Sequence, residues 1–282
     1  MSRLARGCVA AAMASALALA GAGGAQAAQK TVTAAQGPVS AALTYQAASD
    51  RFGNPTYSHE VLKIARAGAT FYEAPAKSPA CSPECDLETF GGGPLQVSEL
   101  EGAGSPSVVL TLNTGGAHCC TIAQIFSLDP GGSTPRMVER DFGDPGVEIT
   151  DVAGDGRLEL QTADDRFAYL FESFAYSGLP IQILRLREGR LVDSTREFPA
   201  AVAADAARQL KAFVANRRAG FGLGFAAAWA ADEALLGRSA QAFARLRREA
   251  HAGRLRSSDP FSPPGGRFVS LLRRRLHKLG YV

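Results

Sequence analysis

Histidine and the common catalytic motifs are scarce in this chain of 282 residues. The sequence holds one tryptophan and four histidines, and none of the histidines stands in a known catalytic spacing. It contains no G-x-S-x-G nucleophile elbow, no H-E-x-x-H zinc motif and no phosphate-binding P-loop. These absences exclude the enzyme classes that depend on those motifs and leave carboxylate-based hydrolysis as the enzymatic alternative.

Long apolar runs are also missing after the first 30 residues. No uninterrupted apolar stretch there reaches about 18 residues, the length that a membrane-spanning helix requires. The mean hydropathy is −0.02, and 46% hydrophobic with 20% charged residues is the composition of a folded globular protein. We therefore expect no transmembrane segment in the mature chain.

The first 28 residues have the pattern of a signal peptide. Arg3 and Arg6 precede an apolar run at 8–20, and Ala25-Gln26-Ala27 supplies the small residues that signal peptidase requires. We expect cleavage after Ala27 or Ala28. The sequence thus predicts an exported protein, either secreted or held in the periplasm or cell envelope.

The mature chain divides into two parts of opposite charge. Residues 29–204 carry 13 Lys and Arg against 22 Asp and Glu, whereas residues 205–282 carry 15 against 5. Opposite charges attract, and a short helical segment gains stability by burying its apolar faces. We therefore expect the basic part to dock on the acidic part in one globule.

Four cysteines remain after the signal peptide and fall into two local pairs, at Cys81 and Cys85 and at Cys119 and Cys120. In an exported chain an even number of cysteines indicates disulfides. Three connectivities are possible; adjacent residues on a strand point to opposite faces, which favours bonds from Cys81 and Cys85 to Cys119 and Cys120. A zinc site that includes His118 is the alternative.

Residues 29–198 read as a β region with an internal repeat at an offset of 52 residues. Phe90-Gly91 returns as Phe142-Gly143, and the glycines at 102 and 104 return at 154 and 156. The two copies cover about 90–141 and 142–195, and each predicts three or four antiparallel strands. We expect two or more blade-like antiparallel sheets in a compact, incomplete assembly.

Residues 199–282 change to a helical period. Apolar residues recur at helical spacing in four segments, which are followed by Gly220, Gly237, Gly253 and Gly280, and Ser239 is placed to cap the third. The predicted fold class is therefore α+β, with the β region followed by a C-terminal helical bundle. Leu271 and four other apolar residues are expected to face inward from the last helix.

The second acidic loop has the spacing of a calcium site. Asp151, Asp155 and Glu159 occupy positions 1, 5 and 9, the carbonyl of Arg157 falls at position 7, and glycines at 4 and 6 allow a tight wrap. Calcium prefers such a set of oxygen ligands on a sharply turning chain. Ala153 replaces the carboxylate expected at position 3, so we expect one weak calcium site.

An FG turn followed by D-x-x-G-D-G-x-x-E resembles the FG-GAP or VCBS-type repeats of exported proteins, which are similar to integrin-type propeller blades. The resemblance covers about residues 90–195 and implies that Asp151, Asp155, Glu159 and the Arg157 carbonyl bind calcium. The first copy has Ala103 where the central Asp belongs, so no ion is expected there. The segments TGGAHCC and ADDRFAYLF also resemble exported bacterial proteins of no assigned activity.

Two further features are compatible with a hydrolase but favour a structural role. Asp164-Asp165 beside Arg166 reads as a turn between strands at 158–162 and 167–171. The aromatic residues between 167 and 176 are more typical of core packing than of a sugar platform. Two carboxyl groups across a cleft are what a glycoside hydrolase requires.

The first functional hypothesis is therefore a non-enzymatic, calcium-stabilised binding or envelope-interaction module with an unknown ligand. Arginines of the basic part, notably Arg273, Arg274 and Arg275, are candidates to contact anionic envelope polymers or lipid headgroups, and we expect no nucleic-acid partner. The alternative is an extracellular hydrolase that acts on sugar or phosphate esters through the acidic loops.

Overall fold

The structure is a computed structural model. It describes residues 27–81, 85–88, 93–115, 120–127, 134–258, 260 and 262–282. The predicted signal peptide lies outside the described residues up to position 26.

The first sheet, sheet A, is a four-stranded antiparallel meander at the N-terminus. Its strands are β1 (Ala28–Gln36), β2 (Val39–Ser49), β3 (Pro55–Arg66) and β4 (Ala69–Pro75). In β2 the buried side chains of Val39, Ala41 and Leu43 alternate with more exposed neighbours. This period of two gives sheet A one apolar face.

The second sheet, sheet B, has five strands in the order β5-β7-β8-β9, with β6 paired to β7. They are β5 (Asp86–Leu87), β6 (Leu95–Ser98), β7 (Ser107–Asn113), β8 (Thr121–Ser127) and β9 (Arg136–Asp141). Every residue of β8 and all but the last of β7 are buried. Such continuous burial is what a strand covered on both faces shows.

The third sheet, sheet C, is another antiparallel meander in the order β10-β11-β12-β13. Its strands are β10 (Glu148–Thr150), β11 (Glu159–Ala163), β12 (Ile181–Arg187) and β13 (Arg190–Asp193). β11 begins 52 residues after β7, and β10 ends 52 residues after β6. The offset in the sequence thus relates equivalent strands of sheets B and C.

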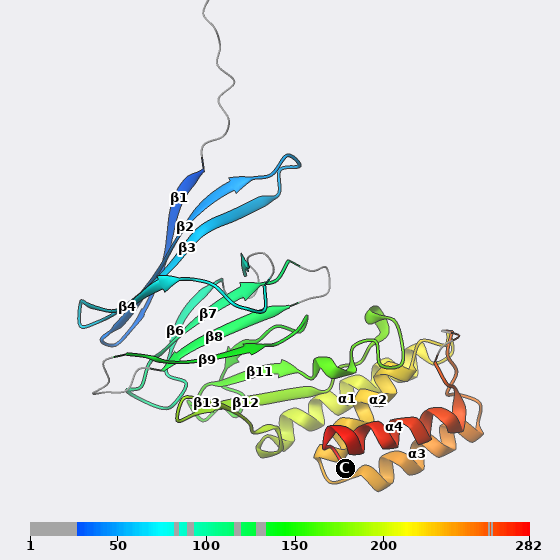
Figure 1. Cartoon of the computed structure of the whole chain (residues 1–282). Coiled ribbons are helices and arrows are strands. Elements are labelled where there is room, and N and C mark those ends of the chain that lie inside the picture. The colour runs from blue at the N-terminus through cyan, green and yellow to red at the C-terminus, as the bar shows by residue number, and fades with distance from the viewer. Residues whose placement is uncertain are drawn as a thin grey trace, which may run out of the picture.

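The three sheets stack in chain order, with sheet B between the other two (Figure 1). Along β7, Leu110 and Leu112 belong to a core shared with sheet A, whereas Val109 belongs to a core shared with sheet C. Neighbouring side chains therefore enter two different cores. This stack of antiparallel sheets, followed by helices, confirms the predicted fold class.

Four helices form the C-terminal part: α1 (Pro199–Asn216), α2 (Leu223–Leu235), α3 (Ser239–His251) and α4 (Gly265–Leu279). Gly280 ends α4 in the left-handed conformation, with φ of 85°, which favours glycine. Two details of the prediction are wrong. Ser239 lies inside the first turn of α3 while Arg238 takes the cap position, and Leu271 is 37% exposed because it lies on the outer side of α4.

The helical part packs against the end of sheet C. Phe167 and Phe171, which follow β11, are buried in the same core as α1–α4. The expected strand at 167–171 is therefore wrong: the chain forms a 3₁₀ helix, η1 (Asp165–Phe167), and turns that direct these rings into the helical core. Arg196 adds hydrogen bonds to the carbonyls of Leu235 and Tyr281.

Within the described residues, no helix is both long and apolar enough to cross a membrane.

Candidate functional site

The predicted calcium loop is closed by its own backbone amides. The Asp151 carboxylate accepts hydrogen bonds from the amides of Asp155 at 3.0 Å and Gly156 at 2.8 Å. The Asp155 carboxylate accepts one from the amide of Arg157 at 3.0 Å. The hydrogen bond from Gly156 is the main cause that lowers the pKa of Asp151.

Glu159, the third expected carboxylate, faces the interior instead. Its side chain is fully buried and pairs with Arg185 at 2.9 Å, and it also accepts a hydrogen bond from the amide of Val152 at 3.2 Å. Arg185 pairs in addition with Glu197 at 2.7 Å. A calcium ion at this loop would therefore compete with Arg185 for the Glu159 carboxylate.

The first loop of the repeat is closed in the same way. There the Glu99 carboxylate accepts a hydrogen bond from the amide of Gly104 at 3.0 Å, which is the same spacing of five residues as from Asp151 to Gly156. Across the described residues, no group of three or more His, Cys, Asp or Glu side chains is placed to hold a metal ion. Calcium binding stays a prediction.

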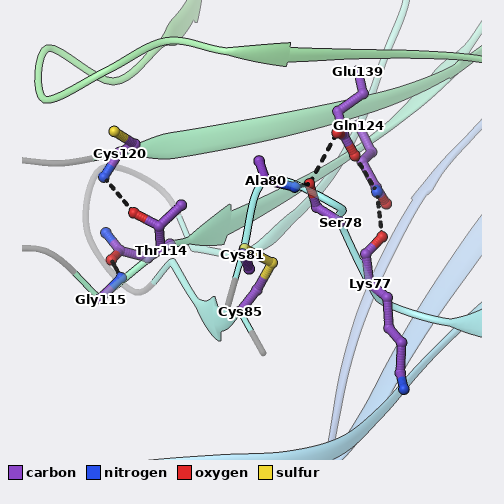
Figure 2. The surroundings of a disulfide bond; sticks show 11 residues. Lys77, Ser78, Ala80, Cys81, Cys85, Thr114, Gly115, Cys120, Gln124 and Glu139 are labelled. Atoms are coloured by element: carbon purple, nitrogen blue, oxygen red, sulfur yellow. Dashed lines mark hydrogen bonds between the residues drawn. A yellow bond between two sulfur atoms is a disulfide. The ribbon is translucent and has the colours of Figure 1, made fainter. Parts of the chain in front are cut away.

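The disulfide pattern differs from the expected one. Cys81 and Cys85 are bonded to each other, with their Cα atoms 5.1 Å apart (Figure 2). Cys120 is also disulfide-bonded, and His118 and Cys119 lie outside the described residues. The predicted bonds from Cys81 and Cys85 to the pair at 119 and 120 are therefore wrong.

The path of the chain before Cys81 explains this pairing. Gln124 on β8 donates hydrogen bonds to the Lys77 carbonyl and to Glu139, both at 2.7 Å, and Ser78 donates one to Glu139 at 2.9 Å (Figure 2). The segment is thus fixed against sheet B, and this places Cys81 within bonding distance of Cys85, which comes just before β5.

A polar pocket of about 690 Å³ opens where sheets B and C meet the helical part. One wall holds Asp164, whose carboxylate makes two hydrogen bonds to the Arg166 guanidinium, at 2.7 and 2.6 Å, and accepts a third from the hydroxyl of Tyr281 at 2.8 Å. The predicted charge balance between Asp164 and Arg166 is confirmed. Tyr281 was not identified from the sequence because it lies 117 residues away.

The other wall of the pocket holds Arg140, Gln182 and Asp193. Arg140 donates to Gln182 at 2.6 Å, and Gln182 donates to Asp193 at 3.0 Å. Although burial alone would raise it, the pKa of Asp193 lies below its ordinary value, because Thr195 and Gln182 donate hydrogen bonds and Arg140 is nearby.

Asp165 lies at the base of the same pocket, against the FG turn of the second repeat. A Cβ atom at Gly143 would fall 2.5 Å from the Asp165 carboxyl carbon, so the glycine makes room for this side chain. Burial, together with the charges of Asp144 and Asp141, raises the pKa of Asp165. The pocket therefore combines carboxyl groups whose pKa values are shifted in opposite directions.

Asp232 on α2 is the most deeply buried acid of the helical part. It is 0% exposed, and neither of its carboxyl oxygens has a hydrogen-bond partner in the described part of the chain. Burial, and next the neighbouring Asp205, raises its pKa to about 10. An acid inside the apolar run FAAAWAADEALL is the signal in the sequence that points to Asp232, which was not predicted.

A groove of about 410 Å³ runs between α3 and α4, the two helices furthest from sheet A (Figure 1). Its lining is Phe243, Arg247, Ala250 and His251 from α3, and Gly266, Val269, Ser270 and Arg273 from α4. Arg273 lies over the Phe243 ring, 5.7 Å from its centroid. The lining contains no acidic residue.

Further arginines lie on α3 and α4 beside this groove. Within the ranges that the structure describes, no ion pair involves Arg247, Arg248 or the three arginines at 273–275. α4 itself contains no acidic residue. We call the exposed surface of α3 and α4 the cationic face.

Comparison with known proteins gives two partial relatives. The probable thylakoid lumen protein sll0997 of Synechocystis sp. is 31% identical to this chain over 144 residues. The matched region covers 44% of this chain and 42% of that protein. The chain is 33% identical over 89 residues to the uncharacterized protein y4bJ of Sinorhizobium fredii. That matched region covers 31% of this chain and 14% of that protein. The chain thus spans less than half the length of these curated relatives.

No family model matches the chain, and no solved structure matches it. The resemblance to FG-GAP or VCBS-type repeats therefore stays a prediction.

Proposed function

We propose that this chain is an exported, non-enzymatic protein that binds anionic surfaces of the cell envelope through the cationic face of α3 and α4. The observation that carries the proposal is the set of arginines on this face that have no acidic partner among the residues that the structure describes. Charges that are not neutralised within the protein remain available to an external anion.

Two features support export. The first 28 residues have the pattern of a signal peptide, and a relative is named as a probable thylakoid lumen protein, a compartment that is reached by export. The disulfide between Cys81 and Cys85 also fits an oxidising compartment.

The position of the face supports a role in surface binding. α3 and α4 lie at the end of the molecule opposite to sheet A (Figure 1), so a flat anionic surface can approach them without contact with sheet A. Each basic residue near an anionic membrane surface contributes about 1 kcal/mol, and the attraction decreases with salt.

The test is co-sedimentation of the mature protein with vesicles that contain anionic lipids and with isolated cell-wall material. Binding should fall steeply between about 50 and about 300 mM salt and be lost when Arg273, Arg274 and Arg275 are changed to Gln. A matched control changes Arg51, Arg157 and Arg190, three exposed arginines of the β region, to Gln. Equal loss in both variants, or no binding at low salt, would reject the proposal.

The polar pocket supports a second candidate, a hydrolase of sugar or phosphate esters. The supporting observation is the raised pKa of Asp165 and the lowered pKa of Asp193 in one pocket, which is the arrangement of an acid and an ionised carboxylate in catalysis. Hydrolysis of a chromogenic glycoside or phosphate ester that is lost in both Asp165→Asn and Asp193→Asn would favour this candidate over the first.

A further inference from the structure

We infer that the groove between α3 and α4 binds the phosphate headgroup of a lipid, with the guanidinium groups of Arg247 and Arg273 on its two walls. This inference rests on the proposed function, because it assigns one headgroup chemistry to the cationic face. The groove volume of about 410 Å³ lies within the range of small-ligand sites.

The two arginines approach the groove from opposite helices. Arg247 belongs to α3 and Arg273 to α4, and both are exposed. Guanidinium groups bind phosphate oxygens through paired N–H donors, and a headgroup with a terminal phosphate offers enough oxygens for both. The contact of Arg273 with the Phe243 ring holds its guanidinium beside the groove.

Two other polar side chains, His251 and Ser270, line the groove. His251, the last residue of α3, lines the groove and supplies a further N–H. The Ser270 hydroxyl already donates to the Gly266 carbonyl at 3.0 Å, so we assign it no contact with the ligand. The ligand must therefore be an anion, since the groove offers cationic donors and no carboxylate.

The charge around the groove favours a phosphate at a lipid surface over a free phosphate ion. Phe243 and Val269 line the groove but are only 5% and 7% exposed, and the Arg273 guanidinium lies over the Phe243 ring, so the groove offers little apolar surface. Arg274 and Arg275 follow Arg273 on α4 and belong to the cationic face. In a membrane, neighbouring anionic headgroups contact these arginines while one phosphate fills the groove, and each such contact adds about 1 kcal/mol.

Gly266 provides an independent indication that the groove is kept open. A Cβ atom at this position would meet no other atom within 4 Å, and Gly266 does not adopt a positive φ. Neither backbone conformation nor close packing therefore requires glycine at this position in the first turn of α4. The missing side chain leaves the space that the ligand would occupy.

The experiment compares phosphatidylcholine vesicles that contain phosphatidic acid with vesicles in which phosphatidylglycerol supplies the same surface charge. We expect the mature protein to bind the phosphatidic acid vesicles about tenfold more tightly. Gly266→Leu, which fills the groove without a change of charge, and the double variant Arg247→Gln, Arg273→Gln should remove this preference. Gly266→Ala is the matched control and should keep it.

The outcomes separate this inference from the proposed function. Equal binding to both kinds of vesicle, or a preference that survives in Gly266→Leu, overturns the headgroup site while the general surface binding stands. No salt-dependent binding to any anionic vesicle overturns both. Soluble glycerol 3-phosphate lacks the neighbouring headgroups that contact the other arginines, so it should bind at least about 100-fold more weakly than the vesicles; equal binding would overturn the assignment to a lipid.

The fold of the variants is checked by thermal unfolding. Gly266→Leu should unfold at the same or a higher temperature, because leucine favours the helix more than glycine does. A lost preference in a variant with an unchanged midpoint is then a property of the groove.

Discussion

The hydroxyl of Tyr281, the second-to-last residue, donates a hydrogen bond of 2.8 Å to the carboxylate of Asp164 at the end of β11. Both residues are buried, and Asp164 also pairs with Arg166. Burial and then the Asp164 carboxylate raise the pKa of Tyr281, so the phenol stays protonated and remains a donor. This contact closes the junction between sheet C and the helical part.

Removal of this hydroxyl should destabilise the protein. Tyr281→Phe leaves a buried charged acceptor with one donor fewer, so we expect the free energy of unfolding to fall by about 1.5 to 3 kcal/mol. Urea unfolding measures this change. Tyr169→Phe is the control, because Tyr169 is 59% exposed and should change stability by less than about 0.5 kcal/mol. Equal effects of the two substitutions would contradict a specific role for Tyr281.

The buried acid Asp232 should make stability depend on pH. Its pKa in the folded state, about 10, is above the value of an unfolded aspartic acid, about 3.9. The folded protein therefore retains a proton that the unfolded chain releases, and the free energy of unfolding decreases as pH rises from about 4 towards 10, by at most about 1.4 kcal/mol per pH unit. Asp205 and Arg208 on α1 and the nearby Tyr281 act on this group.

Asp232→Asn tests this effect, because the amide has no proton to release. We expect this variant to lose less stability than the wild type in urea unfolding between about pH 5 and pH 9. Glu148→Gln, an exposed substitution, should keep the wild-type slope. Parallel curves for the wild type and Asp232→Asn would show that the carboxyl is already ionised at neutral pH.

The calcium prediction is tested by titration calorimetry. If the loop binds calcium, the dissociation constant should be about 10⁻⁴ to 10⁻³ M, as in extracellular modules, and Asp155→Ala should abolish the heat. Glu99→Gln in the first loop, where no ion is expected, is the control and should leave the heat unchanged. No heat with the wild type would exclude the site, and Glu159 would then serve as the partner of Arg185 and of the Val152 amide.

The observed disulfide gives a direct chemical test. Peptide mapping of the unreduced protein should recover Cys81 and Cys85 in one linked species. The double variant Cys81→Ser, Cys85→Ser should lose only about 2 kcal/mol, because the bond closes a short loop. A species that links either residue to Cys120 would contradict the structure.

Local patterns in the sequence predicted the elements well, and long-range pairings poorly. Periodicity located the helices and Gly280 at the end of α4, because those signals are contained in one or two turns of chain. The contact between Tyr281 and Asp164 spans 117 residues, and no local pattern specifies it. The disulfide was mispredicted because the hydrogen bonds from Gln124 that turn the chain before Cys81 come from another strand.

The candidate sites show the same division. The spacing from Asp151 to Glu159 predicted a shared ligand set, yet Glu159 is the first residue of β11 and its side chain turns inward to Arg185. The arginines of the last helix were identified from composition, whereas the groove depends on how α3 packs against α4. Side-chain direction and helix pairing are set by tertiary packing, and they decide what each charged group contacts.

The central strands of sheet B, β7 and β8, are buried on both faces, and this has a consequence for how they align. In a sheet with one solvent-exposed face, a shift of the strand register by one residue exposes apolar side chains and is unfavourable for that reason. In β7 and β8 a shift by one residue would move each side chain from one buried core to the other, so burial alone does not select the register. The few buried polar side chains supply the missing discrimination: Thr111 donates to the Gly93 carbonyl at 3.2 Å, and Gln124 reaches Lys77 and Glu139. A shift of the register by one residue in either direction would remove these hydrogen bonds and leave the two side chains buried without partners. Thr111 and Gln124 therefore specify the register of two strands that are otherwise apolar.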